Sequence, residues 1–348
     1  MEFLTDYGLF LAKAVTVVVA LLVVIGGIVA LSQRRHKESD GHIEVTDLCE
    51  RYADFEEDLK AAILDEDEYK ALHKAERREE KRERKQRKKH KPVEPETKRI
   101  FVLDFDGDIR ASAVDNLREE ISAVLTQARS EHDQVLLRLD SGGGMVHSYG
   151  LAASQLQRLV NANIPLTVAV DQVAASGGYM MACIAQRVIA APFAIIGSIG
   201  VMAQLPNFHR LLKKHEIDVE LHTAGEFKRT LTMFGENTEK GRRKFLEELE
   251  DTHVLFKEFV ARHRPQVEID NIATGEVWYG VQALERGLVD AVRTSDEFLM
   301  EHRKDNQLFL VKYMQKKSWQ EKLGLAAEAS FDRVLGHWLN RLTSRWFL

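Results

Sequence analysis

Cysteine is scarce in this chain of 348 residues, and the two that are present lie far apart. Cys49 and Cys183 stand in unlike contexts, so they give neither a metal-ligand spacing nor a disulfide framework. No other motif calls for a metal, and none calls for a cofactor. With 45% hydrophobic and 30% charged residues, the composition is that of an ordinary globular protein.

Long uncharged apolar runs are also scarce. One such run, residues 14–31, is close to the shortest length that spans a membrane as a helix. It is longer than the apolar core of a typical signal peptide, and Glu2 and Asp6 replace the usual basic start. We therefore expect a single retained N-terminal membrane anchor. A second apolar stretch, 179–201, contains Arg187, which favours buried helix and strand over a second span.

The sequence offers no nearby histidine as the base for its serine motif. Ser176 stands between small residues and a glycine pair, a pattern typical of a strand-to-helix turn that exposes the hydroxyl. Such a hydroxyl needs a base, and the next histidine, His209, lies in a polar stretch predicted as a surface helix. Lys228 follows a glycine turn and adjoins Phe227. A desolvated lysine can act as a base near neutral pH, so the sequence predicts a Ser-Lys dyad.

Two further turns complete the candidate site. Three glycines follow the apolar strand 135–140, and their N–H groups can approach a developing oxyanion. The candidate donors are Gly143 or Gly144, together with Gly177. Ser198 is either part of a plain flexible turn or a second hydroxyl that orients the lysine amine.

These motifs together resemble the S49 peptidases, the signal peptide peptidase A family, and in particular its branch with one N-terminal anchor and a single catalytic half. The resemblance covers residues 98–295 and rests on the segments 140–144, 175–179, 197–201, 225–229 and 287–290. It implies that Ser176 is the nucleophile, that Lys228 is the general base and that Ser198 positions the amine. In one departure, Gly142 stands where the family often has proline.

The resemblance also implies a Clp- and crotonase-like α/β core of repeated β-β-α units around a parallel sheet. The alternating pattern from residue 99 onward agrees with a parallel sheet covered by helices. Strands are expected at 100–104, 135–140, 166–170, 188–191 and 219–223. Helices are expected at 114–129, 148–162, 178–185, 208–215 and 238–263, followed by a helix and glycine turn over 280–290.

The chain divides by composition into four parts. We expect an anchor with its flanks at 1–37, a charged helical stalk or linker at 38–97, the catalytic domain at 98–295 and a helical extension at 296–348. Apolar residues between Val45 and Tyr69 recur at heptad spacing, which predicts a coiled-coil stalk or an amphipathic helix lying on the domain. The apolar stripe of the tail, 318–348, fits packing on its own domain, on a neighbouring subunit or at a membrane surface.

The segment 74–91 holds eleven basic and four acidic residues, a net charge of +7 in a chain whose total is −5. Such a run is most often a solvated helix or linker. Attachment to anionic lipid head groups is the second interpretation. Nucleic acid is not an expected partner, because no aromatic residues are interleaved with the charges.

The sequence therefore predicts a serine endopeptidase anchored in the bacterial inner membrane. The expected partners are the lipid bilayer and extended peptides. The resemblance implies that these peptides include remnant signal peptides, and that further copies of the chain form a ring with active sites between subunits. Basic residues after the anchor favour a cytoplasmic catalytic domain, whereas the resemblance favours the periplasmic face, to which we lean slightly. The alternatives are a crotonase-type acyl-CoA enzyme and a non-catalytic membrane scaffold.

Overall fold

The computed structural model describes residues 13, 15–16, 41–89 and 97–315. Almost all of the expected anchor and the whole of the tail 318–348 lie outside these ranges. Within them, no helix combines the length and the apolar character that a membrane crossing requires.

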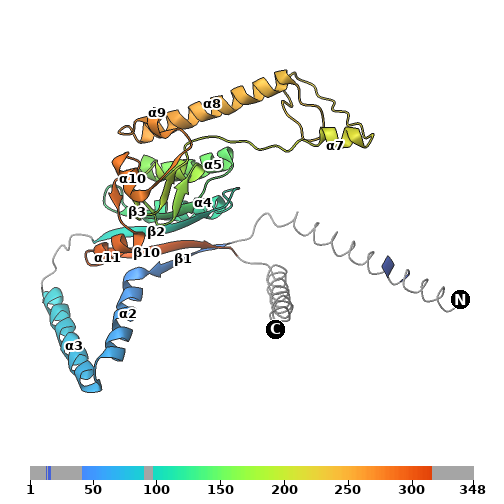
Figure 1. Ribbon diagram of the computed structural model, residues 1–348. Helices are drawn as coiled ribbons and strands as arrows, with labels where there is room; N and C mark the ends of the chain where they lie inside the picture. The colour runs from blue at the N-terminus through green and yellow to red at the C-terminus, as the bar shows by residue number, and fades with distance from the viewer. Residues whose placement is uncertain (1–12, 14, 17–40, 90–96, 316–348) are drawn as a thin grey trace, which may run out of the picture. The chain divides into compact units, whose positions relative to one another are not determined.

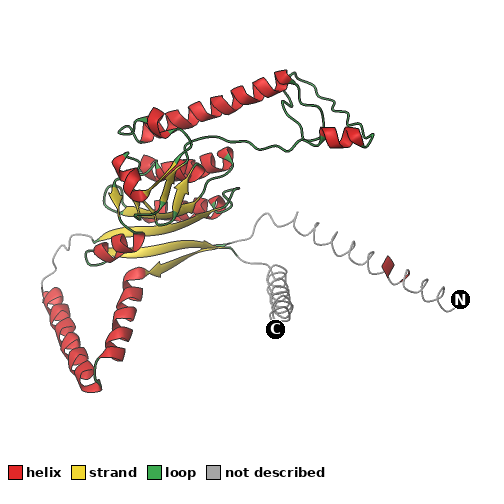
Figure 2. Ribbon diagram, viewed as in Figure 1, coloured by secondary structure: helices red, strands yellow, loops and turns green. Residues whose placement is uncertain are grey.

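The described residues between Ile43 and Tyr313 form one mixed α/β unit with a large sheet (Figures 1 and 2). The strands are β1 (His42–Asp47), β2 (Lys98–Gly107), β3 (Gln134–Ser141), β4 (Leu166–Val170), β5 (Val173–Ala175), β6 (Arg187–Ala190), β7 (Ile195–Gly197), β8 (Val277–Tyr279), β9 (Ala291–Val292) and β10 (Asn306–Met314). The helices are α2 (Leu48–Ile63), α3 (Glu66–Lys89), α4 (Val114–Gln127), α5 (Val146–Asn161), α6 (Gly177–Ala182), α7 (His209–Lys214), α8 (Glu239–His263), α9 (Ile269–Ile272), α10 (Gly280–Glu285) and α11 (Ser295–His302).

The sheet branches at β3. Its main path runs β1-β10-β2-β3-β4-β6-β9, and β3 also pairs with β5, which leads to β7 and then β8. Residues 135–138 of β3 pair with β4, whereas Ser141 at its end pairs with Ala174 of β5. The pairs from β10 to β9 and from β3 to β7 are parallel, and β7 with β8 is antiparallel. Through this branch, the end of β3 lies beside β5, the strand that precedes Ser176.

Apolar side chains cover both faces of the central strands, which explains why β2 and β3 read as nearly continuous apolar runs. On one face, Leu103 and Leu137 pack in a core with residues of α4, α5 and α6. On the other face, Val102 and Leu136 pack with residues of α11 and with Leu48 at the start of α2. Figure 2 shows the strands in yellow between these helices.

Most of the elements predicted from the pattern are present, and one is wrong. Helices are found at or near the predicted positions of α4 to α8, and the apolar stretch 179–201 forms buried helix and strand, as expected. The predicted strand at 219–223 is absent: this fully described stretch is irregular, and no strand occurs between Gly197 and Val277. Its alternating side chains are exposed and no neighbouring strand pairs with them, so alternation alone was insufficient.

The segment expected as a continuous stalk is divided. It begins with the strand β1, and the helices α2 and α3 are separated by a break at residues 64–65. Leu48 is buried and Tyr52 packs against the sheet, so the first turns of α2 lie on the domain, whereas Leu59 is exposed. The Clp- and crotonase-type superhelix and the four domain boundaries stay predictions. Beyond residue 295, α11 contributes to the core and β10 pairs with β2.

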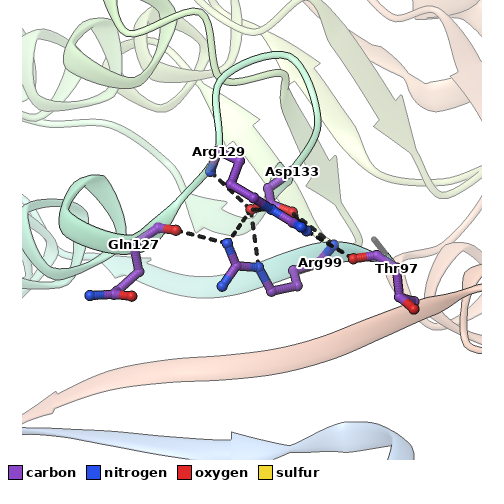
Figure 3. Close-up of polar contacts among 5 residues, drawn as sticks. All are labelled: Thr97, Arg99, Gln127, Arg129 and Asp133. Carbon is purple, nitrogen blue, oxygen red and sulfur yellow. Dashed lines mark hydrogen bonds and ion pairs between the residues drawn. The ribbon is translucent and has the colours of Figure 1, made fainter. Parts of the chain in front are cut away.

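A buried ion-pair network fixes the entry to β2 and β3 (Figure 3). The Asp133 carboxylate is fully buried and accepts hydrogen bonds from the guanidinium groups of Arg99 and Arg129, at 2.6 Å in each case. The same arginines donate to the carbonyls of Gln127 and Thr97. The network thereby joins the start of β2, the end of α4 and the residue that precedes β3.

Candidate active site

Ser176 occupies a sharp turn between β5 and α6. Its backbone has φ 53° and ψ −117°, a conformation that residues other than glycine rarely adopt. Its N–H donates to the Gly197 carbonyl of β7 at 2.8 Å, and the helix begins at the next residue. The side chain is half-buried. Strain held in place by a sheet and a helix is typical of an exposed nucleophile.

The glycine loop after β3 lies directly against this turn. Gly143 has φ 86°, and a Cβ there would stand 2.6 Å from the Gly177 nitrogen and 2.8 Å from the Ser176 Cβ. The Gly143 N–H is already used, because it donates to the Ser141 Oγ at 3.1 Å. The Gly177 N–H begins α6 and therefore has no partner within its helix. The arrangement favours Gly144 over Gly143 as the second oxyanion donor.

A small pocket of about 20 Å³ brings several predicted residues together. Ser176, Gly177 and Gly144 all line it, whereas Gly143 does not. Its other lining residues are mostly apolar: Val146, Met180, Gly200, Val201, Thr252 and Phe256.

Two of these residues come from α8, which the sequence did not connect to the site. Thr252 and Phe256 are one helical turn apart, and Phe256 is buried in the main core. Their spacing predicts a shared helix face. No signal in the sequence indicates that this face reaches Ser176.

Ser198 lies close to the nucleophile through the backbone. It follows Gly197, whose carbonyl accepts the Ser176 N–H, and its own N–H donates to the Glu276 carbonyl at 2.6 Å. Its φ is 50° and its side chain is half-buried. The site therefore contains a second serine in a strained conformation, and its predicted contact with a lysine stays a prediction.

Lys228 is not among the residues that line the pocket beside Ser176. It is exposed on a turn, where its N–H donates to the Gly225 carbonyl at 3.2 Å. Its neighbours contact α8: Glu226 forms an ion pair with Lys240, whose ammonium lies 5.7 Å from the Phe227 ring centre. The acid beside Lys228 thus has another cation as its partner.

Carboxylates gather near the carboxyl ends of β2, β3 and β4. Burial raises the pKa of Asp140, and the nearby charges of Asp106 and Asp171 raise it further. Asp171 accepts hydrogen bonds from the N–H and hydroxyl of Ser295, so it supports the start of α11. The part of the chain that the structure describes contains no cluster of histidine, cysteine and acidic residues suited to a metal.

Comparison with family models gives two matches that together span most of the chain. The model described as peptidase family S49 N-terminal matches residues 2–156. The model described as peptidase family S49 matches residues 158–308. The second match includes Ser176, Ser198 and Lys228.

Individual relatives agree with these models. "Probable protease SohB" of Haemophilus influenzae is 53% identical over 100% of this chain and 99% of its own length. The protein of the same name from Buchnera aphidicola subsp. Schlechtendalia chinensis is 47% identical over 86% of this chain and 99% of its own. "Protease 4" of Haemophilus influenzae is 27% identical over 57% of this chain and 33% of its own.

Proposed function

Because this chain belongs to peptidase family S49, we propose that it is a serine endopeptidase with Ser176 as nucleophile and Lys228 as general base. The observation that carries the proposal is the strained turn at Ser176, with the amides of Gly177 and the glycine loop beside it. Serine hydroxyls held this way beside free N–H groups serve acyl transfer.

The reaction follows from these roles. The Ser176 Oγ attacks the carbonyl carbon of a peptide bond while the neutral amine of Lys228 takes the hydroxyl proton. The N–H groups of Gly144 and Gly177 donate to the resulting oxyanion, each contributing on the order of 3 kcal/mol. The intermediate then expels the amine product, which receives the proton from Lys228 and leaves an ester on Ser176. A water molecule, deprotonated by Lys228, attacks this ester. As the acid product leaves, the Lys228 ammonium returns the proton to the Ser176 Oγ, which restores the serine hydroxyl and the neutral amine.

The second part of the proposal is that Lys228 acts on the Ser176 of a neighbouring copy. An amine in water is protonated at neutral pH, so a lysine base needs an apolar environment. The segment that carries Lys228, residues 201–238, is here called the arm; it includes α7 and is drawn in yellow in Figure 1. The chain before α7 and the chain after it are joined by a hydrogen bond from the Phe208 N–H to the Met233 carbonyl.

The arm is unusually apolar for an exposed segment, and α7 has no buried residue. Its exposed large apolar side chains are Met202, Leu205, Phe208, Leu211, Ile217, Val219, Leu221, Phe227, Met233 and Phe234. Exposed apolar surface of this extent marks a contact with another molecule. A second copy of the chain would cover the arm and remove Lys228 from water in one step.

The proposal includes extended apolar peptides, such as remnant signal peptides, as substrates. The apolar lining beside Ser176 suits such chains, and a ring of subunits would admit extended chains in preference to folded proteins. It also assigns the N-terminal anchor, 14–31, to the bacterial inner membrane, with a slight preference for a catalytic domain on the periplasmic face. The Clp- and crotonase-type core is a further part of the proposal.

Cleavage of a labelled signal-peptide mixture, read by mass spectrometry, tests the proposal. The wild type should cleave, whereas Ser176→Ala and Lys228→Ala should each lose cleavage with the fold intact by circular dichroism. A serine-reactive fluorophosphonate should label the wild type at Ser176. Cleavage by Ser176→Ala, or an unlabelled active protein, would contradict the proposal and favour the acyl-CoA enzyme or the scaffold.

A further inference from the structure

Tyr149 of α5 is a fully buried side chain for which the dyad has no use. Its hydroxyl lies 2.5 Å from the Ser141 Oγ and donates to the Asp108 carbonyl at 2.7 Å. A tyrosine hydroxyl is already protonated at neutral pH, and burial raises the pKa of Tyr149 further. The Ser141 Oγ in turn accepts the Gly143 N–H at 3.1 Å.

These hydrogen bonds form a chain in which each group donates to the next, from the Gly143 N–H to the Asp108 carbonyl. A tyrosine hydroxyl has one proton, and because the Asp108 carbonyl can only accept, Tyr149 must donate there. The Ser141 hydroxyl therefore donates to Tyr149 at 2.5 Å rather than to the more distant Gly107 carbonyl at 3.4 Å, and its lone pair accepts the Gly143 N–H. Bonds that run in one direction polarise and strengthen one another. The glycine loop is thus tied to the turn after β2 through two buried hydroxyls.

The ring of the same tyrosine touches the other side of the site. A Cβ added at Gly177 would stand 2.4 Å from the Tyr149 Cγ, so the ring lies directly against the backbone that follows Ser176. One side chain consequently contacts the Gly177 backbone with its ring and holds the glycine loop with its hydroxyl.

The loop is fixed again two residues later. The Met145 N–H donates to the Ile109 carbonyl at 2.8 Å, and Ile109 follows Asp108 directly. Gly144 stands between Gly143 and Met145, whose N–H groups are hydrogen-bonded to the Ser141 Oγ and the Ile109 carbonyl. The direction of the Gly144 N–H therefore depends on the chain that runs through Tyr149.

We propose that Tyr149 is a positioning residue that acts through Ser141 to set the distance between the two oxyanion donors, the N–H groups of Gly144 and Gly177. This inference rests on the proposed peptidase function. It adds a role for two residues that touch neither the substrate nor the base. The donors must lie near 3 Å from the oxyanion, and a displacement of about 1 Å costs on the order of 100-fold in rate.

Tyr149→Phe is the first test, because it removes the hydroxyl and keeps the ring against Gly177. We expect kcat for peptide cleavage to fall by about 10- to 100-fold with KM changed by less than about threefold, since the lost contact matters chiefly in the transition state. A peptide aldehyde, which forms a hemiacetal with Ser176 and places its oxygen in the hole, should lose affinity by a similar factor. The matching peptide amide should bind as before.

Ser141→Ala is the second variant and keeps the inference testable if the first does not fold. It should show the same kcat loss, and the double variant should lose no more than either single variant, because both act through one chain. Ser295→Ala is the matched control: it removes another buried serine hydroxyl with a 2.5 Å bond, to Asp171, and should leave kcat unchanged.

The outcomes separate the inference from the function on which it rests. A wild-type kcat in folded Tyr149→Phe or Ser141→Ala, while Ser176→Ala is inactive, would overturn the positioning role and leave the peptidase standing. Losses that multiply in the double variant would also overturn it. Cleavage that persists in Ser176→Ala would contradict the peptidase proposal itself.

Discussion

Gly143 combines two constraints that an L-amino acid with a side chain cannot meet. Its φ of 86° is unfavourable for such residues, and a Cβ would stand 2.6 Å from the Gly177 nitrogen and 2.7 Å from the Ala175 carbonyl oxygen. Both atoms belong to the backbone and cannot rotate away. The glycine loop therefore depends on Gly143 for its shape even though Gly144 is the proposed donor.

Gly143→Ala should lower the free energy of unfolding by about 1–3 kcal/mol and cut the cleavage rate at least tenfold. Gly142→Ala is the matched control, because a Cβ at Gly142 meets nothing within 4 Å. Thermal unfolding and steady-state cleavage on both variants check the prediction. Equal behaviour of the two variants would show that crowding at Gly143 does not matter.

The residues of the site differ in how far the sequence could reveal them. Ser176 and the glycine loop could be predicted, because each is a short local turn whose chemistry lies in neighbouring residues. Tyr149 could not, because its partner Asp108 is 41 residues away and their meeting depends on how α5 packs on β2 and β3. The contact of α8 with the pocket was hidden for the same reason.

Among the elements, β2, α4 and β3 are joined by the Asp133 network (Figure 3). Burial alone would raise the pKa of Asp133, but hydrogen bonds from Arg129 and Arg99 outweigh burial and hold the pKa well below its usual range. A carboxyl whose pKa is lowered by folding stabilises the protein above its unfolded pKa, about 3.9. That contribution is lost progressively as the pH falls further.

Asp133→Asn should lower the free energy of unfolding at pH 7 by about 3–5 kcal/mol, because both arginines lose a buried carboxylate. The difference from the wild type should narrow as the pH drops below about 4. Urea unfolding at several pH values measures it. Glu66→Gln, which breaks the exposed pair with Lys70, should have little effect. A difference that stays constant with pH would argue against the ion-pair explanation.

Secondary structure was predictable where the pattern and the packing agree. The buried runs of β2, β3 and β4 have neighbours on both sides and were found from the sequence. The stretch 219–223 alternates like a strand but has no partner, whereas β5, β7 and β9 are only two or three residues long and exist through their neighbours. Strand pairing depends on residues far apart in the chain, so the local sequence alone does not predict it.

At the scale of the whole molecule, the arm should hold subunits together. Leu211 of α7 is 54% exposed in the single chain, so Leu211→Asp should fold normally, yet it would bury a charge if a second copy covers α7. We expect the variant to dissociate and to lose cleavage together. Light scattering after size exclusion in detergent measures the mass.

Met300→Asp on α11 is the matched control, because Met300 is similarly exposed, at 45%, and lies outside both the arm and the predicted stalk. It should leave the mass unchanged. An intact, active oligomer in Leu211→Asp would show that α7 is not at the contact between subunits.

The most direct test of the account is complementation between two inactive variants. Ser176→Ala subunits keep Lys228, and Lys228→Ala subunits keep Ser176, so mixed oligomers would contain some sites with both residues intact if the dyad forms between chains. We predict that mixing and subunit exchange restore part of the wild-type cleavage, whereas either variant alone stays inactive. Mixed oligomers that are proven by differential tags and still show no cleavage would contradict a dyad shared between subunits.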